Sequence, residues 1–430
     1  MNIKLSKISS LQLFQFIRYF SLLLVSILIA KSNLGVENIG IFETKILIGS
    51  SISFFWLNAI VKTLLTTYNE TKYKNKFFSI LIITAFLGVL SYLLLNVIFV
   101  FGNFKIENSP SLNIFFIYIV TIAPASISEY FLLLKNKTRN LLFYGIFIFT
   151  VQILLTIFAL YNYNDIKSLF EVLIFVNILK IIYALYLINK YEQFKISRDY
   201  IIYSIKLARP LMFSFLLSGS AQYIDSFLVS WRFDASVFAI FKYGTKEFPL
   251  LIILTDSFSN AVLSDFKNSG LKETLNLIKN KSEKYMHIFF PVFFVLLLSS
   301  QYLYKIFFSE KFIESSVVFD AYLLIIVSRL TFPQTIVLGL KKNNVIFRAS
   351  LYELIVNVIL SVVFIFYFGI FGVAIATVIA YYFEKIYLMR YLYIKQNIPI
   401  GNYLNIRILV SYSLILYALF FAKLIQLIPF

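Results

Sequence analysis

The sequence has no cysteine and only one histidine, His287, among its 430 residues. The lack of cysteine excludes disulfide bonds, thiolate metal sites and a cysteine nucleophile. A single histidine cannot form a histidine-rich metal site, and a Ser-His-Asp triad would have to use it. The simpler interpretation of His287 is an interfacial residue at the start of a helix. We therefore expect no metal, no cofactor, no catalytic residue and no enzyme.

Charge is also scarce in this sequence. Charged residues make up 14% of the chain, whereas hydrophobic residues make up 60%, and the mean hydropathy is +0.84. An ordinary soluble domain is about 45–50% apolar, so a soluble protein of this size could not bury the surplus. Runs of about 20 apolar residues, enough to cross a bilayer as a helix, recur along the whole chain. The sequence predicts an all-α polytopic membrane protein.

The apolar runs predict about 12–13 transmembrane helices. The first run follows a basic N-terminus without a small-residue cleavage site, so we interpret it as a retained helix and not a signal peptide. Arg407 and Lys423 lie in the last run, which leaves open whether it is a full span. A tight turn around Gly369 and Gly372 joins the eleventh and twelfth spans. The expected spans are 11–30, 39–61, 77–101, 112–134, 141–161, 168–188, 209–231, 236–262, 286–308, 317–338, 346–368, 370–392 and 405–428.

The positions of Lys and Arg indicate the orientation of these spans. With a cytoplasmic N-terminus, the cytoplasmic segments hold 25 of the 39 Lys and Arg residues, and the opposite segments hold 5. This bias accounts for most of the net charge of +18 without a nucleic-acid partner. The longest cytoplasmic loops are 189–208 and 263–285. The second is either a surface helix on anionic lipid or a solvated linker.

A weak internal repeat divides the chain. Residues 7–33 align with 206–232, and residues 38–45 align with 237–244, both at an offset of 199. Repeated bundles are typical of secondary transporters. Six helices return the chain to its starting side, so the halves would be parallel bundles around a central cleft suited to alternating access. We expect a six-helix bundle over 1–195, a second over 196–400 and an extra transmembrane helix over 401–430.

Four segments carry a family resemblance: LGVENIGIFETK (34–45), QYIDSFLVSW (222–231), VFAIFKYGTKEF (237–248) and FGIFGVAIATVIAYYFEK (368–385). Together with the overall plan, they resemble the Wzx-type polysaccharide flippases, which carry O-antigen or capsule repeat units. That family belongs to the MATE-like superfamily, which also holds multidrug exporters and lipid II flippases. Many members have twelve or fourteen helices, whereas thirteen are expected here.

The resemblance implies transport of a lipid-linked glycan. The substrate would be an undecaprenyl-diphosphate-linked oligosaccharide, flipped across the bacterial inner (cytoplasmic) membrane for surface polysaccharide biosynthesis. An H+ or Na+ gradient would drive the cycle, and a polysaccharide polymerase is a possible partner. A lipid II flippase or multidrug exporter of the same superfamily remains an alternative. A membrane polymerase or ligase is another, but it would be expected to carry a large outer loop, which is lacking here.

Charged residues inside the expected helices are the candidates for a substrate site. A charge at the centre of a bilayer costs about 2.5–3.5 kcal/mol on insertion scales, so such a group usually faces a cavity or a partner. Lys242 and Lys246 are four residues apart and would share a helix face. Cations attract a diphosphate and suit a cationic drug poorly. The expected cationic cavity comprises Arg18, Lys180, Lys242, Lys246 and Arg329; the alternative is that each of them snorkels or pairs with a carboxylate.

Asp225 is the carboxylate expected to couple transport to an ion. An acidic group in a transporter cavity can carry a proton or bind Na+ during the cycle. The alternative for Asp225 is a structural ion pair with Lys242 or Lys246. Glu129, Glu353 and Glu384 lie towards the cytoplasmic ends of their expected helices, and we interpret them as ordinary interfacial residues.

Overall fold

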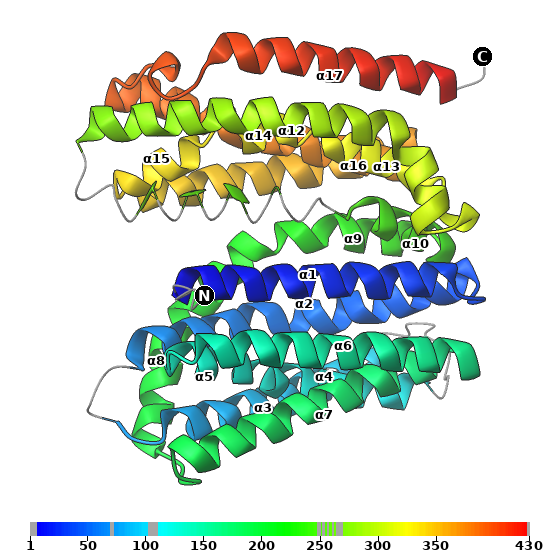
Figure 1. Cartoon of the computed structure of the whole chain (residues 1–430), viewed down its shortest axis with the longest axis vertical. Helices are drawn as coiled ribbons and strands as arrows, with labels where there is room; N and C mark the ends of the chain where they lie inside the picture. The colour runs from blue at the N-terminus through cyan, green and yellow to red at the C-terminus, as the bar shows by residue number, and fades with distance from the viewer. Residues whose placement is uncertain are drawn as a thin grey trace, which may run out of the picture. The chain divides into compact units, whose positions relative to one another are not determined.

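The computed structural model describes residues 7–68, 73–101, 111–246 and 270–427, together with residues 251, 254, 255, 258, 259, 262 and 263. Every regular element in these residues is helical (Figure 1). This follows from the apolar composition, because a chain in lipid must satisfy its backbone hydrogen bonds internally. The chain divides into two compact units, Met1–Tyr223 and Ile224–Phe430, which are described separately.

Most helices of the first unit follow the expected spans closely, except for α8 and the division between α4 and α5. Asparagines with left-handed backbone, among them Asn75, Asn136 and Asn164, flank several of them, and asparagine tolerates this conformation well. The bounds are α1 Lys7–Lys31, α2 Val36–Thr67, α3 Lys76–Phe101, α4 Ser111–Ala125, α5 Ile127–Leu134, α6 Thr138–Asn162, α7 Ile166–Tyr191 and α8 Arg198–Gly219.

The second unit contains shorter and more interrupted helices, in addition to three long ones. The first of them, α9, begins just before the boundary between the units. The bounds are α9 Ala221–Arg232, α10 Ala235–Gly244, α12 Leu271–Phe307, η1 Glu310–Phe312, α13 Ser315–Leu323, α14 Ile326–Arg329, α15 Pro333–Gly339, α16 Asn343–Gln396, η2 Ile400–Asn402 and α17 Ile406–Leu427.

Within the described residues, 9 helices are long and apolar enough to cross a membrane, or up to 10 if the bent pair Ser315–Arg329 and Pro333–Gly339 is one span. The all-helical, multi-pass fold class is thereby confirmed. The expectation of about 12–13 spans is higher than this count. One reason is α16, which counts once although Gly369 divides it. Another is the expected span 236–262, much of which lies outside the described residues.

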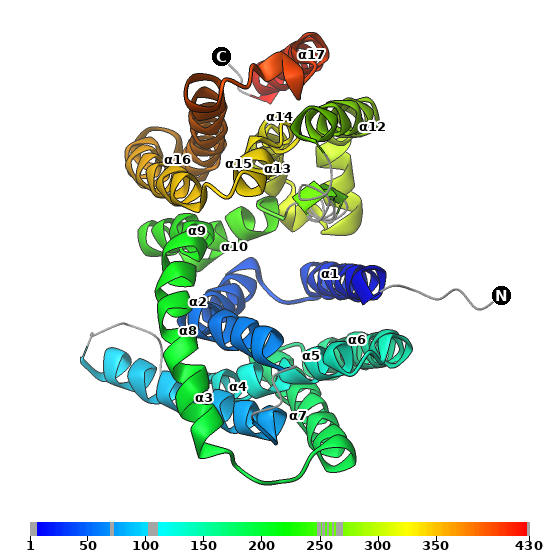
Figure 2. The same cartoon turned by 90° about the vertical axis from the view of Figure 1, so that its left-hand side faces the viewer.

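The first unit is held together by long helix pairs. α1 packs on α6, α4 packs on α3 and α7, and α8 packs along α2 (Figures 1 and 2). Phe14 of α1 lies against Gly145 of α6, where an added Cβ would approach the Phe14 ring to 2.7 Å. Glycine therefore lets α1 and α6 approach closely, as small residues do between membrane helices.

The loop expected over 189–208 is mostly helical, so this expectation was wrong. α8 begins at Arg198 and brings in the basic end of that segment. Tyr200, Ser204 and Ala208 recur every four residues and are all buried, which is the periodicity of a helix face. The positive charges of this segment suggested a loop. They lie on the other sides of the helix, away from its buried face.

The segment 263–285 is likewise helical from Leu271 onward and continuous with α12. Thr274, Ile278 and Ser282 are buried on one face, and Ser282 Oγ donates a hydrogen bond to the backbone oxygen of Leu330. This part is neither a solvated linker nor a helix lying free on the lipid surface. Its buried face packs within the second unit.

Three expected spans are broken. The run 112–134 divides at Ser126, after Pro124, into α4 and α5. The run 209–231 divides between α8 and α9. The run 317–338 divides twice, and its last piece, α15, is bent from the preceding part by 42°. A hydropathy profile does not reveal such breaks, because the residues on both sides of each break remain apolar.

The expected tight turn after residue 368 is confirmed. Gly369 has φ 58° and ψ −141° inside α16, so the helix forms two arms (Figure 2). A Cβ on Gly372 would collide with the backbone oxygen of Phe364 in the other arm. Both glycines are therefore required by the turn, one for its dihedral angles and one for close approach.

We expect Gly369→Ala to lower the free energy of unfolding by about 1–3 kcal/mol, because this region of φ and ψ is almost closed to residues with a Cβ. Unfolding in a denaturing detergent measures the change. Gly401→Ala is the matched control, since nothing lies within 4 Å of its added Cβ. Equal effects of the two substitutions would show that the turn stores no strain.

The last run, left open as a span, forms helix α17 over Ile406–Leu427. Lys423 is not a surface residue: its Nζ lies 2.6 Å from an Asp320 carboxylate oxygen and donates to the Leu297 backbone oxygen at 2.6 Å. On the same face, the Tyr412 ring stacks on Phe290, with centroids 5.0 Å apart. α17 therefore packs along α12 (Figure 1).

Candidate functional site

Asp225 lies one turn into α9, and its residue is 6% exposed. Val229, one turn further, is also buried, whereas Trp231 is 80% exposed. The short helix is therefore amphipathic, and Asp225 is on the side that faces the interior of the second unit.

Four neutral side chains surround the Asp225 carboxylate. Thr377 Oγ1 donates to Oδ2 at 2.5 Å, and Ser361 Oγ donates to Oδ1 at 3.3 Å. The Tyr322 hydroxyl donates to Oδ2 at 3.4 Å, and the Asn357 amide also hydrogen-bonds the carboxylate. We call these five residues the hydroxyl cage. It joins α9, α13 and both arms of α16.

The hydroxyl cage contains no positive charge. Within the described residues, no Lys or Arg forms an ion pair with Asp225, so the alternative of a structural pair with Lys242 or Lys246 is not observed there. A buried carboxylate without a cation is costly. Carboxylate, hydroxyl and amide oxygens are also the donors that hard cations prefer. The cage is therefore chemically suited to hold a proton or a small cation.

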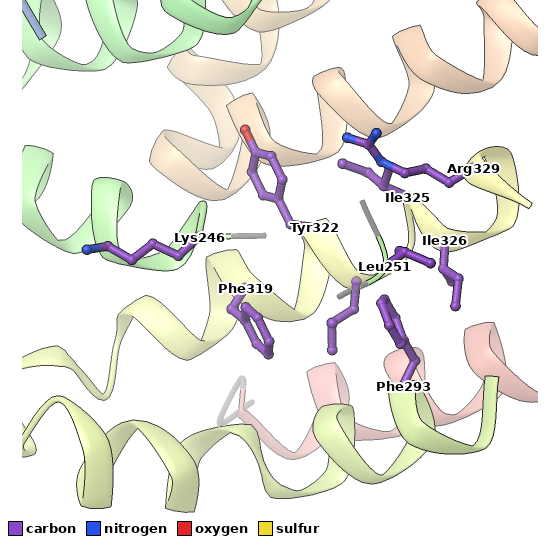
Figure 3. Close-up of a pocket in the computed structure, with 9 residues that line it drawn as sticks. Lys246, Leu251, Phe293, Phe319, Tyr322, Ile325, Ile326 and Arg329 are labelled. Atoms are coloured by element: carbon purple, nitrogen blue, oxygen red, sulfur yellow. The ribbon is translucent and has the colours of Figure 1, made fainter. Parts of the chain in front are cut away.

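A narrow cationic pocket with a volume of about 20 Å³ lies beside the broken helix of the second unit. Lys246 and Arg329 lie at opposite ends of it, and Tyr322 lies between them (Figure 3). None of its described lining residues is acidic. We call it the Arg329 pocket. Its other lining residues are Leu251, Phe293, Phe319, Leu323, Ile325 and Ile326.

The helix break places Arg329 in this pocket. α14 ends at Arg329, and α15 begins at Pro333 after Phe332, which has left-handed backbone at φ 53°. The backbone oxygen of Leu330, freed by the break, accepts a hydrogen bond from Ser282 Oγ at 2.5 Å. Discontinuous helices of this kind form the substrate and ion sites of many secondary transporters.

Two residues connect the Arg329 pocket to neighbouring features of the second unit. Tyr322 lines it and donates to Asp225, so the pocket and the hydroxyl cage share a residue. Arg329 also lines a second, polar pocket of about 100 Å³, where Lys385 donates to Gln334 at 3.2 Å. The guanidinium of Arg329 therefore lies between two pockets of the same unit.

The expectation that Lys242 and Lys246 share a helix face was wrong. α10 ends at Gly244, and Thr245 is its C-cap. Lys246 lies beyond the helix, with Nζ 4.0 Å from the centroid of the Tyr243 ring. A Cβ on Gly244 would meet Val318 Cβ at 2.5 Å, so α10 ends in close contact with α13. Only Lys246 lines the Arg329 pocket; Lys242 does not.

The two remaining expected cations lie together in the first unit. Arg18 of α1 forms an ion pair with Glu129 of α5, and Tyr130 also hydrogen-bonds this carboxylate. Lys180 of α7 lies over the Phe149 ring, 5.8 Å from its centroid, within electrostatic range of Arg18 and Glu129. Glu129 is thus the partner of the half-buried Arg18, and its interpretation as an ordinary interfacial residue was wrong.

The structure therefore groups the expected site residues by unit. Arg18 and Lys180 lie in one unit, whereas Lys246, Arg329 and Asp225 lie in the other. The sequence interpretation missed the polar partners of Asp225. A usable signal was present, because Asn357 and Ser361 are one helical turn apart inside an apolar run. The other missed residues are Tyr322, Thr377, Gln334, Tyr381 and Lys385.

Comparison with known proteins finds a similar fold in solved structures of transporters. The chain is similar to the lipid II flippase MurJ in an inward closed conformation, with 20% identity and a TM-score of 0.72 over 97% of this chain and 93% of that one. The chain has the MATE-like transporter fold. An inward-facing multidrug resistance MATE transporter gives 13% identity and a TM-score of 0.63 over 93% and 94% of the two chains.

A MOP superfamily transporter from Pyrococcus furiosus shows the same fold, with 13% identity, a TM-score of 0.58 and 96% coverage of both chains. No protein-family model and no curated protein matches the sequence. At these identities the MATE-like fold is shown, together with a multi-pass membrane protein. Function has to be argued from the side chains of this chain.

Proposed function

We propose that this protein is a flippase for an undecaprenyl-diphosphate-linked oligosaccharide, in the manner of the Wzx-type family. It would move the repeat unit across a bacterial inner membrane by alternating access, with its N-terminus in the cytoplasm, for surface polysaccharide biosynthesis. The observation that carries the proposal is the Arg329 pocket, which is cationic and lies at a helix break inside a MATE-like fold.

The chemistry of the pocket suits a diphosphate. Arg binds phosphate oxygens through two parallel N–H bonds, and Lys acts as a point charge. Lys246 and Arg329 lie at opposite ends of the pocket, with the Lys246 ammonium directed away from Arg329. Both charges would attract a diphosphate in a state of the transport cycle in which the pocket is wider. The apolar walls from Phe293, Phe319 and Leu251 lower the local dielectric and strengthen this attraction.

We assign the coupling ion to Asp225. The hydroxyl cage shares Tyr322 with the Arg329 pocket, so occupation of the cage by H+ or Na+ would alter the hydrogen bonds of a pocket residue. Because linkage is reciprocal, substrate in the pocket would change the affinity of the cage for its ion by the same factor. This is the coupling that a gradient-driven transporter requires.

Other proposals fit the residues less well. A lipid II flippase also handles a lipid diphosphate, so the Arg329 pocket suits it equally; the segments that resemble the Wzx-type family favour the glycan. A multidrug exporter for organic cations would be repelled by Lys246 and Arg329. A polymerase or ligase would be expected to carry a large outer loop, and the neighbours in fold are transporters.

The experiment follows the lipid-linked oligosaccharide in a deletion strain of the host, with an impermeant probe applied to intact cells and to inverted vesicles. We expect accumulation on the cytoplasmic leaflet, reversed by the wild-type gene. Arg329→Ala and Lys246→Ala should each restore about 10- to 100-fold less flipping, the loss expected for one charge-assisted hydrogen bond.

Lys167→Ala is the control, because this exposed lysine of α7 pairs only with Glu171 one turn away, at 3.7 Å. It should restore flipping fully. Single repeat units on the outer leaflet of the deletion strain would instead indicate a polymerase or ligase and would refute the flippase. Accumulation of lipid II in place of the oligosaccharide would support the alternative flippase.

A further inference from the structure

A second basic pocket lies at one end of the first unit and shares no lining residue with the Arg329 pocket. Its volume is about 730 Å³, and it is formed where α2, α5 and α7 end and α3 begins. Four lysines line it: Lys74, Lys76, Lys135 and Lys190. We call it the lysine pocket. Its other lining residues are Tyr68, Tyr73, Asn75, Tyr191, Glu192 and Gln193.

Two of the lining charges already have structural roles. Lys76 donates from Nζ to the backbone oxygens of Thr67 and Tyr68, each at 2.8 Å, and so caps the C-terminus of α2. Glu192, the one acidic residue among the described lining, accepts from the backbone N–H of Phe77 at 3.0 Å. Burial raises the pKa of Glu192, whereas the backbone hydrogen bonds and the charges of Lys135 and Lys76 lower it.

The other three lysines have no such role. In the described part of the chain, no carboxylate lies within ion-pair distance of Lys74, Lys135 or Lys190, and none of them donates a hydrogen bond to a helix C-terminus as Lys76 does. Lys135 lies among three aromatic rings, 5.5 Å from the Tyr68 centroid and 5.6 Å from the Tyr191 centroid. Among the described lining residues, four lysines thus face a single carboxylate, that of Glu192, so positive charge is in excess.

The position of the lysine pocket indicates which class of ligand it binds. Its residues follow or precede helices that span the membrane, so it lies at the depth of the lipid headgroups, and tyrosines are typical of that depth. Basic pockets between transmembrane helices bind anionic lipid headgroups. Exposed apolar side chains, Phe194 at 52% and Tyr186 at 54%, lie close along the chain and suit contact with lipid.

We propose that the lysine pocket binds the phosphate of an anionic phospholipid headgroup through Lys74, Lys135 and Lys190. This site is separate from the Arg329 pocket and does not depend on the transported substrate. The lipid would bridge the start of α3 and the ends of α5 and α7, three helices of the first unit.

Native mass spectrometry of the purified, full-length protein tests the site, with phosphatidylglycerol and phosphatidylcholine titrated in parallel. The triple variant Lys74→Ala, Lys135→Ala, Lys190→Ala should bind phosphatidylglycerol about 100-fold more weakly, since each lysine near the headgroups contributes to the attraction. Its binding of phosphatidylcholine should not change. The matching triple Lys→Arg variant should retain binding, and its retention would show that charge and not the fold is tested.

The triple variant Lys167→Ala, Lys272→Ala, Lys284→Ala removes the same charge from exposed helix positions outside the pocket and should bind phosphatidylglycerol like the wild type. Equal binding of phosphatidylglycerol by the pocket variant and the wild type would overturn the proposal. So would displacement of the lipid by millimolar inorganic phosphate that itself remains bound, because the ligand would then be a soluble anion.

Discussion

Asp225→Asn is expected to reduce transport at least about tenfold and to abolish its dependence on an H+ or Na+ gradient, at unchanged protein abundance. Asparagine keeps the shape of the side chain and can still accept from Ser361 and exchange a hydrogen bond with Thr377. What it loses is the negative charge that attracts the ion. The transport rate and its dependence on the gradient can be measured in proteoliposomes with an imposed gradient and a fluorescent lipid diphosphate.

The stability expected for the Asp225→Asn variant separates a loss of transport from a loss of folding. Burying an amide in the hydroxyl cage costs less than burying a carboxylate, so Asp225→Asn should unfold at the same denaturant concentration as the wild type or at a higher one. Loss of transport would then not be due to unfolding. Asp199→Asn, the same change at an exposed position in the first turn of α8, should leave transport intact. If the Asp225→Asn variant is fully active and still depends on the gradient, the hydroxyl cage has no part in the transport mechanism.

Asp320→Ala is expected to lower the free energy of unfolding by about 3–5 kcal/mol, because it leaves the Lys423 ammonium buried without its counter-charge. The side chains of Asp320 and Lys423 are 4% and 13% exposed, and their charged atoms are 2.6 Å apart. Lys423 also donates to Ser300 Oγ at 2.5 Å. The Asp320–Lys423 ion pair, with the contact to Ser300, therefore holds α17 against α12 and α13. Unfolding in a denaturing detergent, followed by tryptophan fluorescence, measures the loss.

An exposed ion pair of equal length gives the comparison. Lys305 and Glu310 are 2.7 Å apart, but their side chains are 56% and 74% exposed. Glu310→Ala should have no measurable effect, since exposed pairs contribute little. Asp320→Leu combined with Lys423→Met should recover most of the stability, because an apolar pair can replace a buried ion pair. If the double variant is as unstable as Asp320→Ala, packing and not charge explains the effect.

Helices α1, α2, α3, α6 and α7 of the first unit could be predicted closely from the sequence, because Lys, Asn or Asp residues lie near the ends of their apolar runs. Helix breaks could not be predicted in the same way. Pro210 and Pro291, which could simply mark helix starts, lie inside α8 and α12 without ending them. The break between α8 and α9 at Ser220 has no proline at all. Neighbouring helices replace lost backbone hydrogen bonds, so proline alone neither makes nor excludes a break.

The candidate site was predictable as a set of residues but not as an arrangement. Arg18, Arg329 and Asp225 stand out in the sequence as charges within apolar runs. Their partners do not: Glu129 is 111 residues from Arg18, and Thr377 is 152 residues from Asp225. The spacing of Asn357 and Ser361 marks a polar face, but serine, threonine and asparagine occur throughout the helices, so the sequence cannot show that this face surrounds Asp225.

The sequence by itself determined that this chain crosses a membrane repeatedly as helices, because its apolar runs leave no other way to satisfy the backbone in lipid. Only the tertiary structure decided which helix faces meet, where helices break and which charges are paired. The reason is the solvent: in lipid, both the protein-facing and the lipid-facing sides of a helix are apolar. Hydrophobic periodicity, which marks the buried face of a helix in water, therefore carries little information here.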